Sequence, residues 1–341
     1  GMLACALLRQ QAGGRTWAMA GRCGWKLELV KGKFGKGVFF RGATRVETEE
    51  DVERVARTAR VVIDLTGPKW QLAGMVARAC VRAGSHYIES TGVPGDVLAA
   101  RQVRDSLDAE AKASGVALLF FCGWSSVWVD FGVWLIVRHL REKYGVPTLR
   151  VDEYRAFRAF NVGGTQLLGY RGPDDFDQAL QRMGGPFPLG GTRPGGVRKE
   201  DMEFKGCRFD EFFGFHFING QPPDKWVSRC SCEMFEESHP YGDRFLQRAW
   251  EIHADKHSAS MGQVSAHFLR AGYDSNVAEQ KIPAPGQGPK ERIRKESSFS
   301  LAFVAEADEA REERRKAYCL VNAGHGSLND PYESTITLSI E

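Results

Sequence analysis

Small residues and one arginine follow four of the predicted strands, where a doubly wound sheet binds its cofactor. They are Gly21, Arg22, Thr66, Gly67, Pro68, Thr91, Gly92, Cys122 and Gly123. Turn backbone at such strand ends passes beneath a dinucleotide, and a guanidinium beside the ribose holds the 2′-phosphate of NADP in bidentate fashion. These residues therefore predict a dinucleotide site at the carboxyl ends of the strands.

Each of these residues also has a simpler structural explanation. Arg22 would suit a surface position beside the next helix, and Thr66-Gly67-Pro68 terminates a strand in any fold. Cys122 fits a small buried residue better than a nucleophile, because no histidine follows it at a telling spacing. The sequence assigns no catalytic acid–base pair.

Serine chemistry and metal binding are the other possibilities. Cys122-Gly-Trp-Ser-Ser126 lacks the second glycine of a nucleophile elbow, so a helix N-cap role is favoured for Ser125 or Ser126 over a partnership with Asp130. Cys230-Ser-Cys232 and the pair His253 and His257 contain ligand residue types but no complete motif. No metal site is predicted.

Tyr154, Arg155 and Arg158 lie on a predicted long strand. They either orient an acidic substrate or form the charged solvent face of that strand, and the sequence leaves both open.

The elements that position the predicted site alternate along the first half of the chain. Strand patterns occupy residues 16–20, 37–40, 61–65, 86–90 and 116–121, separated by helical patterns at 25–31, 48–57, 72–83 and 97–114 and followed by a helix at 129–143. This alternation predicts an α/β fold with a doubly wound, mostly parallel sheet. The expected first strand, with its glycine-rich turn, is missing.

That strand would lie at the centre of the sheet, between the strand ending at Ala20 and the one starting at Val61. Without it the two neighbours stand about 9.6 Å apart, which is two inter-strand spacings. We expect either that they pair directly or that another segment fills the gap. In both cases the pyrophosphate loses its helix N-terminus, so NADP should bind weakly or not at all.

The pattern changes after residue 147. Residues 149–160 alternate for twelve positions, which predicts the longest strand of a second domain, and further alternation occurs at 226–235, 263–268, 298–305 and 317–322. The second half is therefore predicted to be an α+β domain built on an antiparallel sheet. We place the domains at 1–147 and 148–341, with helix 129–143 packed on the parallel sheet. The charged residues 311–316 should form a solvated helix face or a hairpin tip.

Composition restricts the class of protein. The 341 residues are 43% hydrophobic and 26% charged, which is typical of a two-domain globular protein. The formal charge of +3 is too small and too scattered to imply a nucleic-acid partner, so none is predicted. Eight irregularly spaced cysteines favour a reducing, intracellular compartment, cytoplasmic or organelle-associated. No apolar run reaches the ~18 residues of a membrane span, although residues 127–137 leave docking on a membrane surface open.

Four segments in the same order resemble the saccharopine dehydrogenase-like oxidoreductases. Trp17-Ala-Met-Ala-Gly-Arg22 with Lys26-Leu27 is similar to the family's "WALAGR…KL", and Leu65-Thr-Gly-Pro68 with Val76–Cys80 and Gly84–Tyr87 is similar to "LVGPY…VVxACxxxGTHY". Cys122–Gly132 is similar to "CGFDSIPSDLG", and Gly163-Gly164-Thr165 to "GGT". The chain departs from the family in lacking the opening strand and "GxxGxTG" turn, and in having Ser125 at the acidic position of "CGFDS".

The resemblance implies a Rossmann-like domain, NADP as the cofactor and a homodimer. Hydride would pass between the nicotinamide and an unidentified small substrate held between the domains. The alternative is a non-catalytic scaffold or assembly protein that retains the fold with a truncated nucleotide-binding site.

Overall fold

The computed structural model describes residues 8, 14–37, 39–67, 69–90, 94–158, 187–191, 207–211, 214–219, 222–234, 241–253, 255–257, 259, 273–280, 284, 287 and 298–324. The chain divides into two compact units. Within the described residues, the first unit extends from β1 to β5, and the second contains nearly all of α6 and every later element.

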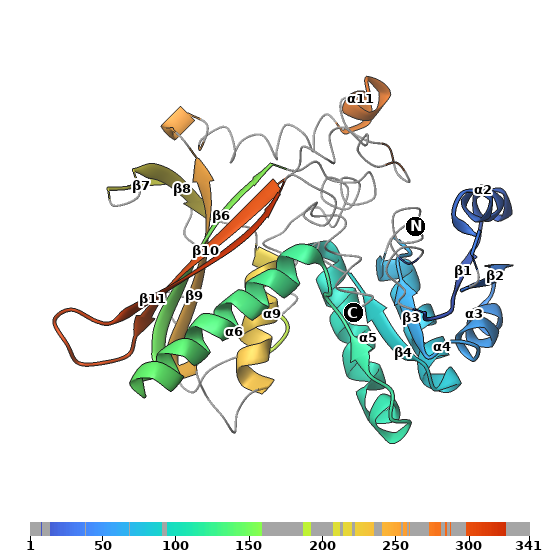
Figure 1. The fold of residues 1–341 in the computed structure, drawn as a ribbon, viewed down its shortest axis with the longest axis horizontal. Coiled ribbons are helices and arrows are strands. Elements are labelled where there is room, and N and C mark those ends of the chain that lie inside the picture. The colour runs from blue at the N-terminus through green and yellow to red at the C-terminus, as the bar shows by residue number, and fades with distance from the viewer. Residues whose placement is uncertain are drawn as a thin grey trace. The chain divides into compact units, whose positions relative to one another are not determined.

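The first unit alternates strands and helices, as predicted. Its elements are β1 (Trp17–Gly21), α2 (Gly24–Phe34), β2 (Phe40–Arg45), α3 (Glu49–Ala56), β3 (Val61–Asp64), α4 (Lys69–Ala83), β4 (His86–Glu89), α5 (Pro94–Ala113, partly in the second unit) and β5 (Leu118–Leu119) (Figure 1). All of its strand pairs are parallel. The predicted α/β class with a doubly wound sheet is confirmed.

The parallel strands form two separate sheets, β1-β2 and β3-β4-β5. Direct pairing of β1 with β3, one of the two expected outcomes, is therefore wrong. The observed order matches the doubly wound order with an interruption between β1 and β3. No residue of β1 is buried, although strands near the centre of such a sheet are normally covered on both faces.

Contacts between α3 and the α4–β4 segment hold α3 beside the β3-β4-β5 sheet. Arg82 of α4 bonds Glu49 at 2.6 Å and Glu53 at 2.7 Å, both on α3. These exposed ion pairs contribute little, because solvent screens them. The buried Ser85 hydroxyl contributes more, since it donates to the carbonyl oxygen of Ala56 at 2.7 Å and ties the end of α3 to the start of β4.

Local signals explain the boundaries in this unit. Thr48 and Asp51 form the capping box that begins α3, with the Thr48 hydroxyl accepting the Asp51 N–H at 3.1 Å. Tyr87 of β4 and Cys80 of α4 are fully buried in the core that joins helix to sheet. The parallel pairing of β3, β4 and β5 places their carboxyl ends at one edge of the sheet.

The second unit is built on a six-stranded sheet of order β11-β10-β6-β9-β8-β7. Its elements are α6 (Trp124–Tyr144), β6 (Thr148–Arg158), β7 (Cys207–Asp210), β8 (Phe215–Asn219), α9 (Pro222–Met234), β9 (Tyr241–His253), α11 (Tyr273–Ala278), β10 (Ser298–Ala307) and β11 (Lys316–Gly324). Strands β6 and β9 are parallel and the other pairs are antiparallel, so the sheet is mixed.

Helix α6 packs against this mixed sheet, beside α9 (Figure 1). A Cβ atom at Gly132 of α6 would lie 2.3 Å from Cε2 of Phe303 on β10, so the helix touches the strand through its backbone. The Ser231 hydroxyl of α9 donates to Asp130 of α6 at 2.8 Å. The prediction that residues 129–143 pack on the parallel sheet is wrong, because spacing reveals a buried helix face and not the sheet that covers it.

Other expectations for this half have mixed outcomes. Residues 222–234 form helix α9, so the strand predicted from residue 226 is wrong. Strand β9, with 13 residues, is longer than β6, with 11. Residues 298–305 and 317–322 are strands as predicted. The charged segment 311–316 covers part of the loop that joins β10 to β11 and the first residue of β11, so it forms a hairpin tip as one of the two expectations had it. Residues 163–165 and 263–268 lie outside the described residues.

Alanine substitutions at two helical glycines, one that contacts β10 and one that is open to solvent, test this packing. Gly132→Ala should lower the free energy of unfolding by about 1–3 kcal/mol, because its methyl group would overlap the Phe303 ring. Gly32→Ala in α2 should raise it by about 0.5–1 kcal/mol, since no atom lies within 4 Å of the added Cβ and alanine favours the helix. Urea unfolding of both variants measures the difference, and equal effects would contradict the contact between α6 and β10.

Candidate functional site

Two buried carboxylates lie side by side at the carboxyl ends of β3 and β4. Asp64 and Glu89 are the last residues of their strands and are partners in the parallel register. Their exposed fractions are only 3% and 1%. In both strands one residue separates the acid from a Thr-Gly pair: Thr66-Gly67 follows Asp64, and Thr91-Gly92 follows Glu89. Sequence reasoning missed both acids, although this repeated pattern was a signal for them.

Asp64 organises the turn that ends β3. Its Oδ1 atom accepts hydrogen bonds from the Thr66 N–H at 2.9 Å and the Thr66 hydroxyl at 2.7 Å. Its Oδ2 atom accepts one from the Tyr87 hydroxyl at 2.9 Å. Burial, and then the charges of Asp64 and Glu89, raise the pKa of Tyr87. The phenol therefore stays protonated and remains a donor to Asp64.

Glu89 organises the turn that follows β5. Its Oε1 atom accepts the Phe121 N–H at 2.8 Å, and its backbone carbonyl accepts the Cys122 N–H at 2.9 Å. These two bonds hold Phe121 in the left-handed region, at φ 63°, which costs a non-glycine residue of the order of 1–2 kcal/mol. Backbone strain of this kind is found where a site needs a fixed geometry.

Cys122 and Gly123 lie in the turn that Glu89 holds. Burial, and then the charge of Glu89, raise the pKa of the Cys122 thiol to about 11. The thiol is therefore neutral at physiological pH, as expected for a small half-buried residue rather than a nucleophile. The Cβ position of Gly123 is 3.7 Å from the carbonyl oxygen of Ser90, so the turns after β4 and β5 are in contact.

Gly21 and Arg22 end β1, in the other sheet of this unit. The Gly21 carbonyl accepts the Val46 N–H at 3.1 Å, and a Cβ atom at Gly21 would lie 3.4 Å from Leu27. The Arg22 side chain is exposed and, in the part of the chain that the structure describes, has no carboxylate partner. The described predicted residues thus lie at two places: Thr66, Gly67, Cys122 and Gly123 follow β3 and β5 of one sheet, and Gly21 and Arg22 lie at the end of β1 in the other. Pro68, Thr91 and Gly92 lie outside the described residues.

The predicted arginine of the long strand has a different role from either alternative. Arg155 is buried, and its terminal nitrogens bond Asp224 of α9 at 2.9 Å and Glu153 of its own strand. Asp224 also accepts the Ser126 hydroxyl at 2.7 Å. Arg155 therefore anchors α6 and α9 to β6 and is not available to orient an acidic substrate. Ser126 lies inside the first turn of α6, so its predicted N-cap role is wrong.

Asp130 of α6 is an acid of the second unit whose pKa is raised. Burial raises its pKa to about 6, and the hydrogen bond from Ser231 opposes that rise. Asp130 accepts from Ser231, whereas the Ser126 hydroxyl donates to Asp224, so these hydrogen bonds do not join Ser126 to Asp130. Within the described ranges, no three His, Cys, Asp or Glu side chains gather as metal ligands, and no helix is long and apolar enough to cross a membrane.

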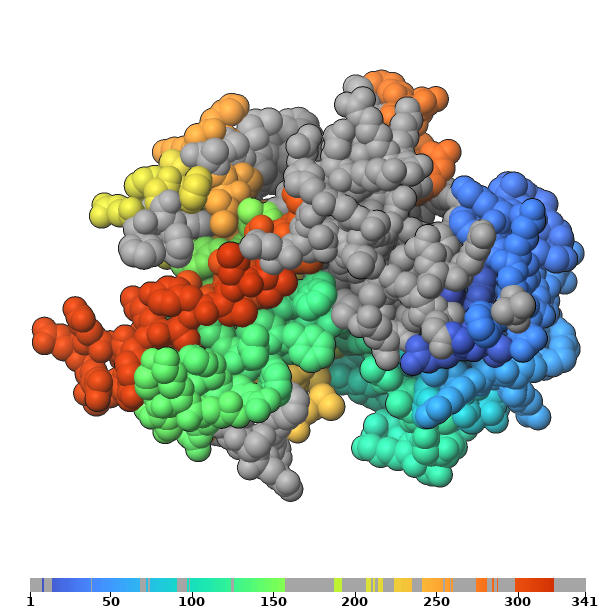
Figure 2. Space-filling view, in the orientation of Figure 1, coloured from blue at the N-terminus to red at the C-terminus, as the bar shows by residue number. Residues whose placement is uncertain are grey.

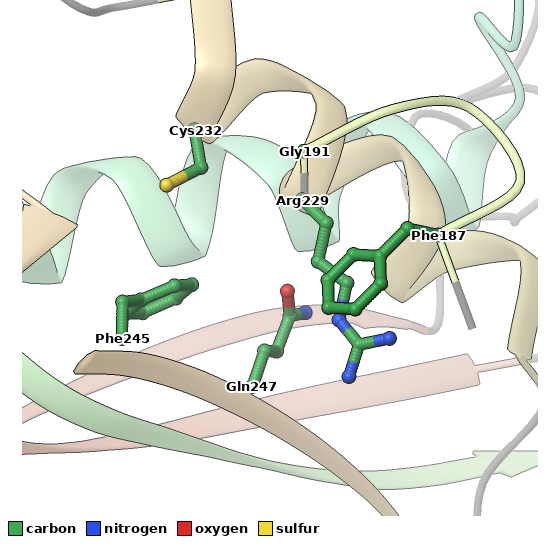
Figure 3. A pocket seen from close by; sticks show the side chains of 6 residues that line it. All are labelled: Phe187, Gly191, Arg229, Cys232, Phe245 and Gln247. Carbon is green, nitrogen blue, oxygen red and sulfur yellow. The ribbon is translucent and has the colours of Figure 1, made fainter. Parts of the chain in front are cut away.

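A small cavity lies between α9 and β9. Phe187, Gly191, Arg229, Cys232, Phe245 and Gln247 line it, with the Arg229 guanidinium 4.7 Å from the centre of the Phe187 ring (Figure 3). Its volume of about 10 Å³ holds a single water molecule. A cofactor or substrate needs several hundred Å³, so this cavity is not the active site.

Comparison with known proteins confirms the fold. Saccharopine dehydrogenase (L-Glu forming) from Saccharomyces cerevisiae superposes with a TM-score of 0.53 over 100% of this chain and 88% of that one, at 9% identity. The chain therefore has the fold of that protein, with a Rossmann-like domain and a second sheet domain. No protein-family model matches the chain.

Two curated relatives show low sequence identity. A trans-acting enoyl reductase from Mycobacterium leprae is 28% identical over 315 residues, which cover 83% of this chain and 73% of that protein. A lipid droplet localized protein from Caenorhabditis elegans is 30% identical over 130 residues, which cover 36% of this chain and 30% of that protein. The match thus spans less than a third of the C. elegans protein.

The bond between Asp64 and Tyr87 can be isolated by a double-mutant cycle. Asp64→Ala should lower the free energy of unfolding by about 2–4 kcal/mol, because it leaves the Tyr87 hydroxyl and two groups of Thr66 without their acceptor. Tyr87→Phe should cost less, and the double variant should show a coupling energy of about 1–2 kcal/mol. Additive effects in urea unfolding would show that the two side chains do not interact.

Proposed function

We propose that the chain is a saccharopine dehydrogenase-like oxidoreductase that binds a nicotinamide dinucleotide at the carboxyl ends of β1, β3 and β5. The observation that carries the proposal is the pair of buried acids that fix the turns after β3 and β5. Burying a carboxylate costs solvation free energy, so buried carboxylates are expected where a turn must have a fixed geometry. The turns after β3 and β5 lie where doubly wound folds bind cofactors. The dehydrogenase fold and the reductase name of the M. leprae relative support the same class of reaction.

Within this proposal, the residues that would hold the cofactor are those of the strand ends. Thr66 and Gly67 would present backbone groups to the nicotinamide half, with Cys122 and Gly123 beside them. Arg22 would bind the 2′-phosphate of the adenosine ribose, which makes NADP the preferred cofactor. A bound nicotinamide supplies hydride transfer. The turns would position the ring and exclude water from it, while the substrate and its acid–base group remain unassigned.

The interruption between β1 and β3 supports the prediction of weak binding. A pyrophosphate in this fold rests on the turn that follows a strand placed between those two. No described strand occupies that place, so we propose a dissociation constant for NADP above about 10 μM, near −7 kcal/mol. The second candidate is a non-catalytic scaffold that retains the fold, which Ser125 at the acidic position of "CGFDS" favours. An intracellular location remains part of the proposal.

A homodimer is also proposed. Tyr318 and Leu320 are exposed on β11, the edge strand of the mixed sheet, and edge strands with exposed apolar side chains are suited to pairing with another chain. Sedimentation at micromolar concentration tests this point, and a single species of monomer mass would refute it.

Cofactor preference gives the direct test of the proposed site. Arg22→Ala should weaken NADP binding by roughly 1–3 kcal/mol and leave NAD binding nearly unchanged, because only NADP loses a charge-assisted contact. Arg41→Ala is the matched control, since Arg41 is an exposed arginine on the neighbouring strand β2. Isothermal titration of both cofactors measures the effect. Equal weakening of NAD and NADP would show that Arg22 is structural, and NADP binding below 10 μM would refute the weak-binding claim.

A further inference from the structure

Positive charge is concentrated in one part of the first unit. Residues 15–45, which contain β1, α2 and β2, hold eight lysines and arginines and a single acid, Glu28, a formal charge of +7. The whole chain carries only +3, so the remaining residues are net negative. We call this segment the basic lobe. A field of one sign on a small lobe attracts an anionic partner.

Helix α2, in the basic lobe, is apolar on two opposite sides. Leu27 faces β1, since its Cδ2 atom lies 3.4 Å from the Cβ position of Gly21. Trp25 and Leu29 are four positions apart and therefore share a face, which the helical spacing places opposite Leu27. Their exposed fractions are 68% and 58%, and α2 has no buried residue. A surface helix needs only one apolar face for its own fold, so the outward one is unexplained by folding.

Lysines surround this outward apolar face. The Lys26 ammonium lies 5.5 Å from the centre of the Trp25 ring, and Lys33 lies four positions after Leu29. In the part of the chain that the structure describes, neither lysine has an ion-pair partner, whereas Lys31 pairs with Glu28 at 3.4 Å. Figure 2 shows the blue residues of the basic lobe at the surface of the molecule.

We propose that the outward face of α2 docks on the surface of a membrane that contains anionic phospholipid. Tryptophan and leucine flanked by lysines are the residues of interfacial helices, which bury the apolar side chains at the headgroup boundary and hold the cations among the headgroups. A nucleic acid is the less suitable anion, because Leu29 cannot stack on a base and one tryptophan makes no stacking platform.

The size of the face sets the strength of docking. Helix α2 has 11 residues, so it lies along the surface and does not cross the bilayer. Two inserted side chains and a few lysines give weak, reversible binding that depends on anionic lipid and falls with salt. This proposal concerns a face other than the strand ends, so it stands or falls independently of the cofactor.

Vesicle sedimentation with the full chain tests the proposal. The protein should sediment with vesicles of phosphatidylcholine and phosphatidylserine at low salt, and much less with vesicles of phosphatidylcholine alone. Trp25→Ala/Leu29→Ala should weaken binding about tenfold or more, and Lys26→Gln/Lys33→Gln by about three- to tenfold with a smaller salt dependence. Phe209→Ala/Met234→Ala is the matched control, because it removes two exposed apolar side chains of the second unit that have no role in the proposed site or dimer.

Hydrogen exchange provides a second readout that does not require a variant. Residues 24–34 of the unaltered protein should gain protection when anionic vesicles are added, and residues 316–324 should not. Equal binding to both kinds of vesicle, unchanged binding by the Trp25→Ala/Leu29→Ala variant, or protection outside α2 would overturn the proposal. Binding of single-stranded oligonucleotide in place of vesicles, lost in the lysine variant, would overturn it in favour of a nucleic acid.

Discussion

The backbone of a parallel strand must find hydrogen-bond partners where the strand ends, and the first unit meets this constraint with two buried carboxylates. Asp64 accepts the donors of the turn after β3, and Glu89 accepts the donor of the turn after β5. Both acids lose their hydration, so their value lies in the geometry they impose. Glu89 holds the left-handed conformation of Phe121, and Asp64 accepts a hydrogen bond from Tyr87, whose pKa is raised by burial and then by the charges of the two acids.

The second unit uses buried charge for a different purpose. Arg155 bonds carboxylates from its own strand and from α9, and Asp224 extends the network to the first turn of α6. A buried ion pair of this kind adds little net stability, because desolvation offsets its attraction. What it fixes is the position of two helices on one face of the mixed sheet. Charged residues thus set turn geometry in one unit and helix placement in the other.

The sequence was sufficient where a local signal decides the structure. The β-branched residues before Asp64 predict β3, and the Thr48 capping box predicts α3. It was insufficient where long-range packing decides. The alternation from Trp226 is compatible with a strand, yet a helix buries Trp226, Ser228 and Arg229 against the sheet. Periodicity revealed the buried face of α6 but could not say which sheet covers it.

The candidate site was predicted in part for the same reason. Glycines and small residues mark Thr66-Gly67 and Cys122-Gly123 as turns, because their chemistry is local. Asp64 and Glu89 were not recognised, since a charge at the end of an apolar strand is usually solvated and only the three-dimensional register shows that the two are buried neighbours.

The central claim is that these two carboxylates shape a dinucleotide site. Hydrogen exchange of the full chain with and without saturating NADP tests it most directly. The account predicts added protection at residues 21–24, 64–67 and 121–123, the ends of β1, β3 and β5, with none in β10 or β11. Protection confined to the second unit, or no protection at a concentration where titration shows full occupancy, would contradict it.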